Sequence, residues 1–146
     1  MSDTLFFDTN VLLDVLLARR PFVEPAQRLW TLADRNKIRG AVSSASFLNV
    51  YYVVRRLGSR AQADQAVHGM RSIFHIVPVD ERIIDEAIAA RSADFEDAVQ
   101  IACAIRAGAT CIITRDERHF ARSPLPAIAP DAFLAELESS GNGPSL

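Results

Sequence analysis

Three aspartates in this chain stand where hydrophobic segments end. Asp8 follows the apolar run Leu5-Phe6-Phe7, Asp116 follows the strand-like segment 111–114, and Asp97 lies on the apolar side of a helical pattern. A buried carboxylate at the end of a strand costs free energy unless a cation or hydrogen bonds neutralise it. Three such carboxylates, all at the ends of elements, suggest one common cation. The sequence therefore predicts a metal-dependent acidic site on an α/β scaffold.

The chemistry of such a site needs only oxygen ligands. Mg²⁺ prefers carboxylates, usually one or two of them, together with waters and substrate phosphate. There it would polarise a phosphoryl oxygen and lower the pKa of a water for in-line attack. The histidines His68, His75 and His119 show no ligand spacing. We interpret them as solvated or locally bonded, with His119 also able to approach a phosphate.

Each acidic residue also has a purely structural interpretation. An Asx turn at Asp8 could cap the first helix, and Asp116 could cap a helix or a turn after its strand. Asp94, Glu96 and Asp97 fall in the first turn of a helix, where negative charge suits the helix dipole. Capping explains Asp94 and Glu96 well, but Asp97 less well, because an N-terminal carboxylate need not face the core.

Length and composition indicate one ordinary domain. The chain has 146 residues, of which 49% are hydrophobic and 23% charged, as in soluble globular proteins. No apolar run approaches the ~20 residues that a membrane span requires, so we expect no membrane partner. No basic region precedes Leu5-Phe6-Phe7, which argues against a signal peptide. Cys103 and Cys111 lie in apolar stretches and are expected to be buried, reduced thiols, which favours a cytoplasmic location.

The overall charge permits a nucleic-acid partner without indicating one. The formal net charge is −2, and it becomes +1 if a metal neutralises the three aspartates. Lys37 is the only lysine among 16 basic residues. Arginine side chains match phosphate geometry well, but a coding bias towards arginine would produce the same count.

The elements that would position the acidic residues alternate between strand and helix. Such alternation predicts a three-layer α/β/α domain with a mainly parallel sheet. Ligands of these sheets bind beyond the carboxyl ends of the strands, where both Asp8 and Asp116 fall. Asn10 is the expected cap of the first helix. We expect strands at about 4–8, 41–42, 76–79, 111–114 and 127–128, helices from about 10 and at about 24–36, 45–57, 60–73, 81–91, 94–107 and 130–137, one domain over residues 1–138, and a frayed tail at 139–146.

Three motifs also carry a family resemblance. They are Phe7-Asp8-Thr9-Asn10-Val11-Leu12-Leu13-Asp14, then Asp94-Phe95-Glu96-Asp97-Ala98-Val99-Gln100, and finally Ile113-Thr114-Arg115-Asp116. In this order they resemble a PIN domain, the family that includes the VapC-type ribonuclease toxins of bacterial toxin–antitoxin pairs. The resemblance covers nearly the whole chain.

The resemblance implies specific roles for the motif residues. PIN domains bind Mg²⁺ or Mn²⁺ through motif aspartates and cleave single-stranded RNA. Carried onto this chain, the metal-binding and catalytic residues are Asp8, Asp97 and Asp116. Supporting polar roles fall to Asn10, Asn49 and Thr114.

The sequence departs from the family pattern at one acidic position. The family commonly has a glutamate on the helix after the second strand, and the segment 43–52 places Asn49 there. Asparagine brings no charge. A subset resembling this chain combines that asparagine with Asp-x-Glu-Asp on the later helix. Asp94 and Glu96 are therefore candidates to provide the missing charge.

Basic residues near the expected crevice are candidates for RNA contact. Arg115 adjoins Asp116, and Arg118 and Arg122 follow. They could follow an RNA backbone, with affinity that falls as salt rises. Taken singly, an arginine at each of these positions is more often simply solvated. We retain Arg115 and Arg118 as RNA-binding candidates.

The favoured function is a metal-dependent endoribonuclease, the toxin of a two-gene pair. By analogy with the family, its expected partners are an antitoxin protein and a second copy of the chain. A second hypothesis is a catalytically weak or inactive PIN-like module that binds RNA or protein, because Asn49 replaces an acid. A third class, aspartyl-phosphate enzymes and receiver domains, fits poorly, because Thr9-Asn10 breaks the Asp-x-Asp pattern and Lys37 is no late lysine.

Overall fold

The computed structural model describes residues 3–141 and contains one five-stranded sheet. The strand order is β3-β2-β1-β4-β5, and each neighbouring pair runs parallel. The predicted mainly parallel sheet is therefore confirmed. Residues 142–146 of the expected frayed tail lie outside the described residues. The strands are β1 (Thr4–Phe7), β2 (Arg39–Ser43), β3 (His75–Val77), β4 (Cys111–Ile113) and β5 (Ala127–Ile128).

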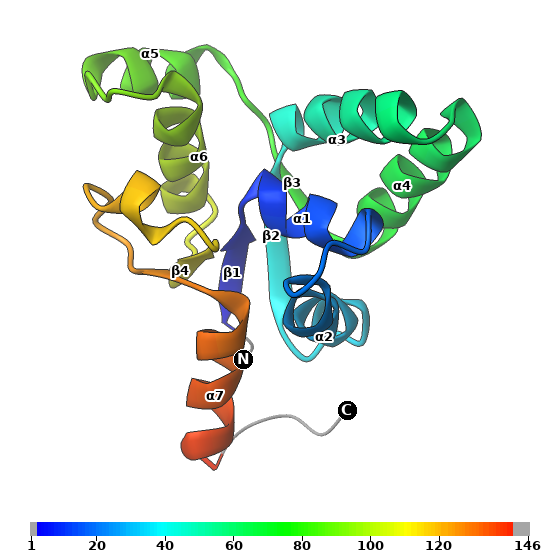
Figure 1. Ribbon diagram of the computed structural model, residues 1–146. Coiled ribbons are helices and arrows are strands. Elements are labelled where there is room, and N and C mark those ends of the chain that lie inside the picture. Colours follow the sequence, from blue (N-terminus) through cyan, green and yellow to red (C-terminus); the bar gives the residue numbers. More distant parts are fainter. Residues whose placement is uncertain (1–2, 142–146) are drawn as a thin grey trace.

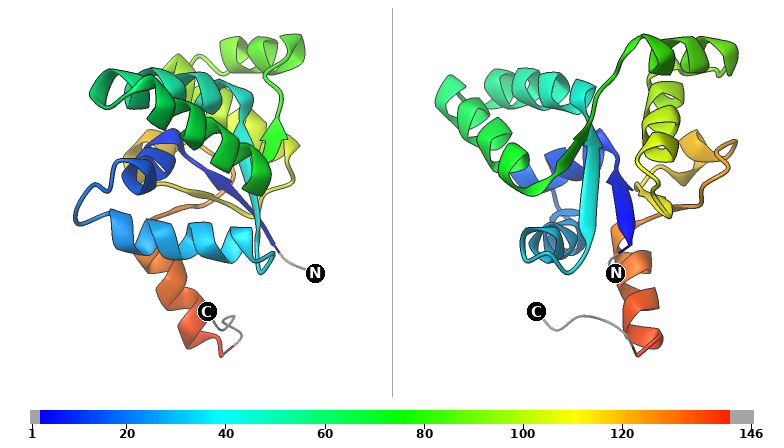
Figure 2. Two further views of the ribbon diagram at one scale, coloured as in Figure 1. Left: turned by 90° about the vertical axis from the view of Figure 1, so that its right-hand side faces the viewer. Right: turned by 180° about the vertical axis from the view of Figure 1, so that it is seen from behind.

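Helices cover both faces of the sheet, which confirms the three-layer α/β/α architecture. Figures 1 and 2 show α5, α6 and η1 on one side of the strands and α1 to α4 on the other, with α7 near the amino ends of the strands. Within residues 3–141, no helix combines the length and apolarity needed to cross a membrane. The helices are α1 (Thr9–Leu16), α2 (Val23–Asp34), α3 (Ser44–Leu57), α4 (Arg60–Ile73), α5 (Glu81–Ala89), α6 (Phe95–Arg106), α7 (Pro130–Ser139) and the 3₁₀ helix η1 (Glu117–Phe120).

Alternating side chains on the strands divide the core into two clusters. Leu5 and Phe7 of β1 pack in the cluster that includes α1 to α4 and α7, whereas Phe6 packs in the cluster with α5 and α6. The period of two along a strand produces this division. Because both faces are buried, β1 reads as a continuous apolar run. The run ends at Asp8, which leaves the carboxylate at the edge of both clusters.

Local hydrogen bonds explain most helix starts, with one correction to the sequence prediction. Ser43 accepts a hydrogen bond from the amide of Ala45, and Asp80 accepts one from Ile83, as capping residues do. The first helix is capped at Asp8 and not at Asn10, so that prediction is wrong. The Asp8 carbonyl already accepts the amide of Val11 at 3.0 Å, which places the N-cap two residues earlier than expected.

Candidate functional site

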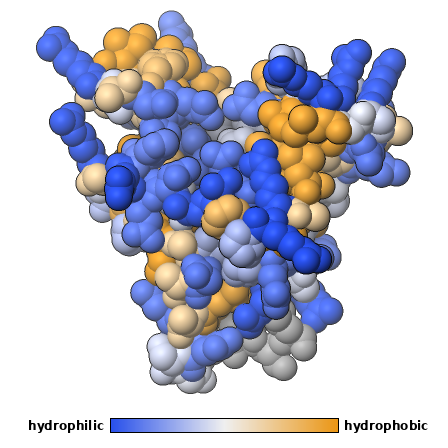
Figure 3. Space-filling view, in the orientation of Figure 1, coloured by the Kyte–Doolittle hydropathy of each residue, from blue (hydrophilic) through white to orange (hydrophobic). Residues whose placement is uncertain are grey.

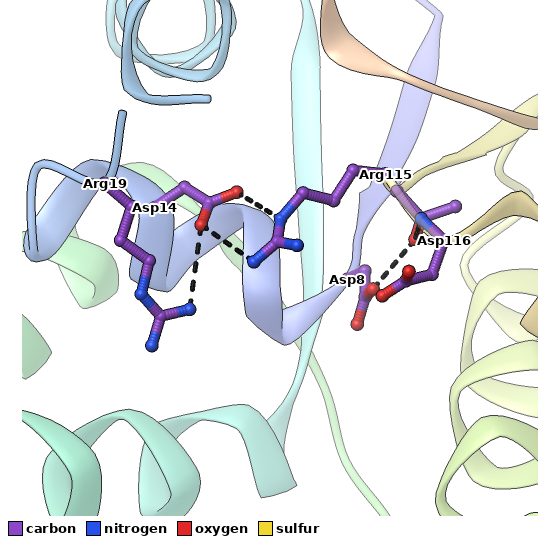
Figure 4. A network of polar contacts seen from close by, with 6 residues as sticks. Asp8, Asp14, Arg19, Arg115 and Asp116 are labelled. Carbon is purple, nitrogen blue, oxygen red and sulfur yellow. Dashed lines mark hydrogen bonds and ion pairs between the residues drawn. The ribbon is translucent and has the colours of Figure 1, made fainter. Parts of the chain in front are cut away.

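The carboxyl ends of β1 and β4 bring Asp8 and Asp116 together. Phe7 pairs with Ile113 in the sheet, so the next residues, Asp8 and Thr114, are neighbours. The Thr114 hydroxyl donates to Oδ2 of Asp8 at 2.8 Å and accepts the amide N–H of Asp116 at 3.0 Å. Figure 4 shows the two aspartates side by side at this point. One buried hydroxyl thus fixes the first aspartate and the loop that carries the last.

Asp8 is a buried carboxylate without a cationic partner. It is 5% exposed, and it forms no ion pair with any residue in 3–141. Burial raises the pKa of Asp8, and the charge of Asp116 raises it further. Hydrogen bonds from Thr114, Gln100 and the backbone of Asn10 lower the pKa but do not cancel the effect of burial. Asp8 therefore lacks a positive charge that a metal ion would provide.

Asp97 reaches the same site from the first turn of α6. It is 9% exposed, and burial raises its pKa to about 6, with further increases from Asp94, Asp8 and Glu96. His119 acts in the opposite direction, with its Nδ1 atom 3.6 Å from Oδ2 of Asp97. Because the charge of Asp8 acts on Asp97, the helical carboxylate and the strand-end carboxylate belong to one acidic cluster.

The structure separates capping acids from the rest. The Asp94 carboxylate accepts the amide of Asp97 at 3.1 Å and so caps α6, which agrees with its structural interpretation. Asp116 stands at the N-cap position of η1 without a capping hydrogen bond, and the Asp8 carboxylate, at the N-cap position of α1, accepts from the Thr114 hydroxyl. Glu96 as a whole residue is exposed. Partial burial of its carboxyl group, together with the charges of Asp94 and Asp8, nevertheless raises its pKa.

The two expected supporting asparagines lie at different depths. Asn10 is half-buried in the first turn of α1, directly after the Asp8-Thr9 pair. Asn49 is exposed on α3, and its side chain makes no hydrogen bond to any residue of 3–141. Thr9 and Ser46 join these two helices through a buried hydroxyl pair, with their Oγ atoms 2.7 Å apart. A neutral polar contact thus connects α1 to α3 beside the acidic cluster.

Gln100 is a site residue that the sequence analysis did not single out. It is 4% exposed and lies three residues after Asp97, on the same face of α6. Its amide hydrogen-bonds Asp8, and its Oε1 is the one buried side-chain oxygen or nitrogen in residues 3–141 without a partner. A glutamine among Ala98, Val99 and Ile101 was the available signal, because a buried polar side chain needs the same explanation as a buried aspartate.

Arg115 faces away from the cluster and holds the loop after β4. Its guanidinium contacts Asp14 on α1, with Nε–Oδ2 at 2.9 Å and Nη2–Oδ1 at 3.3 Å, and lies 4.2 Å above the ring of Phe22. Arg19 approaches the same carboxylate at 3.6 Å (Figure 4). Arg115, expected to contact RNA, thus has an internal partner. Arg118, by contrast, is exposed.

The donor set fits a hard divalent cation. Asp8, Asp97 and Asp116 offer only carboxylate oxygens, which suit Mg²⁺ or Mn²⁺. None of the three pairs with a lysine or arginine anywhere in the described part of the chain. With the side chains as they stand, no three His, Cys, Asp or Glu groups of residues 3–141 are close enough together to enclose an ion. The residues therefore fit a cation chemically, and their side chains would have to converge to hold one.

Comparisons with known proteins agree with this architecture. A family model described as a PIN domain matches residues 4–118. A comparison with curated proteins finds no match. Among solved structures, a toxin–antitoxin complex from Klebsiella pneumoniae is similar with a TM-score of 0.65 and 22% identity, covering 86% of this chain and 97% of that one.

Two further solved structures are similar at comparable levels. VapC20 of Mycobacterium tuberculosis, described as a sarcin–ricin loop cleaving toxin, matches with a TM-score of 0.66 and 18% identity, over 81% of this chain and 94% of that one. DNA-bound VapBC from Salmonella typhimurium matches with a TM-score of 0.65 and 18% identity, over 88% and 97%. At these identities the likeness concerns the fold.

Proposed function

Because this chain belongs to the PIN domain family, we propose that it is a Mg²⁺- or Mn²⁺-dependent endoribonuclease that cleaves single-stranded RNA. The observation that carries the proposal is the buried Asp8 carboxylate, whose charge acts on Asp97 and which lies beside Asp116 without a cationic partner. An uncompensated group of buried carboxylates is costly in a folded protein unless it binds a cation.

The residues divide the work between binding the metal and orienting its ligands. Asp8, Asp97 and Asp116 would hold the metal, and Thr114 and Gln100 orient Asp8 through hydrogen bonds. A bound Mg²⁺ or Mn²⁺ supplies Lewis-acid activation of the phosphoryl group and a water of lowered pKa. Glu96 is the better placed of the two acids proposed to compensate for Asn49, because Asp94 uses one carboxylate oxygen to cap α6.

The test compares cleavage of a labelled single-stranded RNA by the wild type and by Asp8→Asn. The wild type should cleave with Mg²⁺ or Mn²⁺ and stop in excess chelator, and Asp8→Asn should lose at least about 100-fold in rate. Asp64→Asn is the matched control, because Asp64 is exposed on α4 and the change removes the same charge. Cleavage that persists in chelator, or full activity of Asp8→Asn, would contradict the proposal.

We further propose that the chain is the cytoplasmic toxin of a type II pair and that it binds an antitoxin protein and a second copy of itself. The similar structure from Klebsiella pneumoniae is described as a toxin–antitoxin complex, and the one from Salmonella typhimurium as DNA-bound VapBC. Exposed apolar residues support a protein partner: Leu48, Tyr52 and Leu57 of α3 are 76%, 64% and 66% exposed. Figure 3 shows apolar surface over α3 and over α5, with hydrophilic surface between them. Light scattering of the chain alone and after co-expression with a small neighbouring gene tests both partners.

The alternative function is a binding module with weak or absent catalysis. Two observations favour it: Asn49 replaces an acidic residue, and the carboxylates of residues 3–141 do not converge closely enough to enclose an ion. Calorimetric titration with Mn²⁺ separates the two functions. RNA affinity without Mn²⁺ binding would favour the binding module, and micromolar to millimolar Mn²⁺ binding would favour the nuclease.

A further inference from the structure

A surface groove lies between α6 and η1, and its lining includes Asp97 of the acidic cluster. Its volume is about 1030 Å³. One wall is the turn from α5 to α6 together with the start of α6, and the other is the segment from η1 to Pro124 (Figure 1). Asp94 and Asp97 are its acidic lining residues. The remaining lining residues include Arg91, Arg118, His119 and Arg122, alongside apolar Ala90, Ala98, Ile101 and Pro124.

The arginines of this groove carry uncompensated positive charge. Arg91, Arg118 and Arg122 are exposed, and none forms an ion pair with any residue of 3–141. Arg106 and Arg115, by comparison, each pair with an aspartate at 2.7 and 2.9 Å. A chain with a formal net charge of −2 thus gathers three unpaired guanidinium groups along one groove. Such a surface attracts polyanions.

His119 connects the groove to the acidic cluster. Its Nδ1 lies 3.6 Å from Asp97, and its side chain is 58% exposed on the groove side of η1. The charge of Asp8 in turn raises the pKa of Asp97, so these two carboxylates interact. A chain of negative groups bound to the arginines would therefore lie close to the carboxylates where we place phosphodiester cleavage.

We propose that this groove binds the sugar–phosphate backbone of single-stranded RNA on one side of the scissile phosphate, an inference that rests on the proposed nuclease function. Guanidinium groups bind phosphate through paired N–H donors. Three such groups line the groove, more than a single phosphate needs, which suits a strand with several phosphates. Its apolar residues, Ala90, Ile101 and Pro124 among them, provide surface for ribose and base.

The experiment measures RNA binding in chelator, where cleavage cannot interfere. Fluorescence anisotropy with a labelled single-stranded RNA compares the wild type with Arg118→Gln/Arg122→Gln. The double variant should bind roughly tenfold more weakly or worse, and the slope of log K against log salt should fall by about 1.4, about 0.7 for each lost phosphate contact. Arg60→Gln/Arg71→Gln on α4 is the control, because it removes the same charge from exposed positions outside the groove.

The outcomes distinguish this inference from the nuclease proposal. Equal RNA affinity and salt slope in the groove variant and the wild type, at unchanged Tm, would overturn the groove assignment even if the protein cleaves RNA. Equal losses in the groove variant and the α4 control would overturn it too, since binding would then follow net charge alone. Weaker RNA binding in the groove variant of a protein without nuclease activity would support the groove and reject only the catalytic proposal. Binding of an acidic peptide but not of RNA would reject RNA as the ligand.

Discussion

At the scale of single residues, the pKa of Asp8 depends on the balance between burial of its carboxylate and the hydrogen bonds that the carboxylate accepts. Three groups hydrogen-bond this carboxylate, namely Thr114, Gln100 and the backbone of Asn10, yet the pKa of Asp8 stays above its ordinary value. Burial outweighs them because removing a charge from water costs more than neutral donors return. Asp14 is as deeply buried but has two arginines. Asp14 thus forms a structural ion pair, whereas Asp8 is left without a cationic partner.

A residue-scale prediction concerns Gln100. Gln100→Leu removes the amide that hydrogen-bonds Asp8 and keeps a similar side-chain volume. The Asp8 carboxylate thereby loses a contact that both orients it and stabilises its charge. We expect the dissociation constant for Mn²⁺ to rise roughly tenfold, as for other residues that orient metal ligands. Calorimetry measures this, with Gln65→Leu on exposed α4 surface as the control. An unchanged Mn²⁺ affinity would assign Gln100 to packing alone.

Sequence reasoning located residues that interrupt an apolar pattern more readily than residues that depend on tertiary contacts. The positions of Asp8 and Asp116 near strand ends were predictable, because Asp8 directly follows β1 and Asp116 lies in the short loop after β4. The role of Gln100 was not, because it depends on which side of α6 faces β1. Asn10 was predicted as a helix cap, but the turn after β1 starts at the Asp8 carbonyl, a detail of backbone geometry that composition does not encode. Asn49 as a supporting residue stays a prediction.

At the scale of elements, the neighbouring strands β1 and β4 and the ion pair of Asp14 with Arg115 determine the geometry of the candidate site. The five strands and seven helices were predictable because apolar periodicity and capping residues mark them. The short helix η1 was not predicted, since four residues carry no periodic signal. The ion pair of Asp14 and Arg115 connects α1 to the loop after β4, across 101 positions of sequence. Asp8 precedes that helix and Asp116 lies in that loop, so the ion pair fixes the two metal-ligand candidates relative to each other.

An element-scale prediction follows for Arg115→Gln. Asp14 keeps Arg19 at 3.6 Å, so the protein should fold, with a loss of about 1–3 kcal/mol in unfolding free energy. In addition, the loop carrying Asp116 loses its anchor, and Mn²⁺ affinity should fall roughly tenfold. Denaturant unfolding and calorimetry measure the two effects. Ile83→Val, a core change on α5, is the control: it should lower stability with no effect on Mn²⁺. A stability loss in Arg115→Gln without a change in metal affinity would contradict a positioning role.

At the scale of the whole molecule, the acidic cluster and the basic groove adjoin each other at the start of α6. Burial and, to a smaller extent, the charges of neighbouring carboxylates raise the pKa values of Asp8, Glu96 and Asp97, while Arg118 and Arg122 line the groove. A net charge near zero conceals this separation. Composition therefore permitted a nucleic-acid ligand without indicating one, because the argument depends on where the fold places the charges.

The last prediction is that the metal-free protein becomes more stable as pH falls from about 7.5 to about 5. The folded-state pKa values of Asp8 and Asp97 lie above the ordinary value of 3.8, near 6 for Asp97. Between these limits the folded state binds more protons than the unfolded state, so the unfolding free energy rises as pH falls through the folded pKa. Thermal unfolding in chelator should show Tm higher at the lower pH by about 3–8 °C, or about 1–2 kcal/mol. Asp97→Asn should reduce the difference. Addition of millimolar Mg²⁺ should raise the Tm of the protein mainly at the higher pH. At that pH the carboxylates of Asp8 and Asp97 are ionised in the folded state and can bind the cation. A Tm that falls with pH over this range, or a Mg²⁺ effect equal at both pH values, would show that these carboxylates are compensated without a metal.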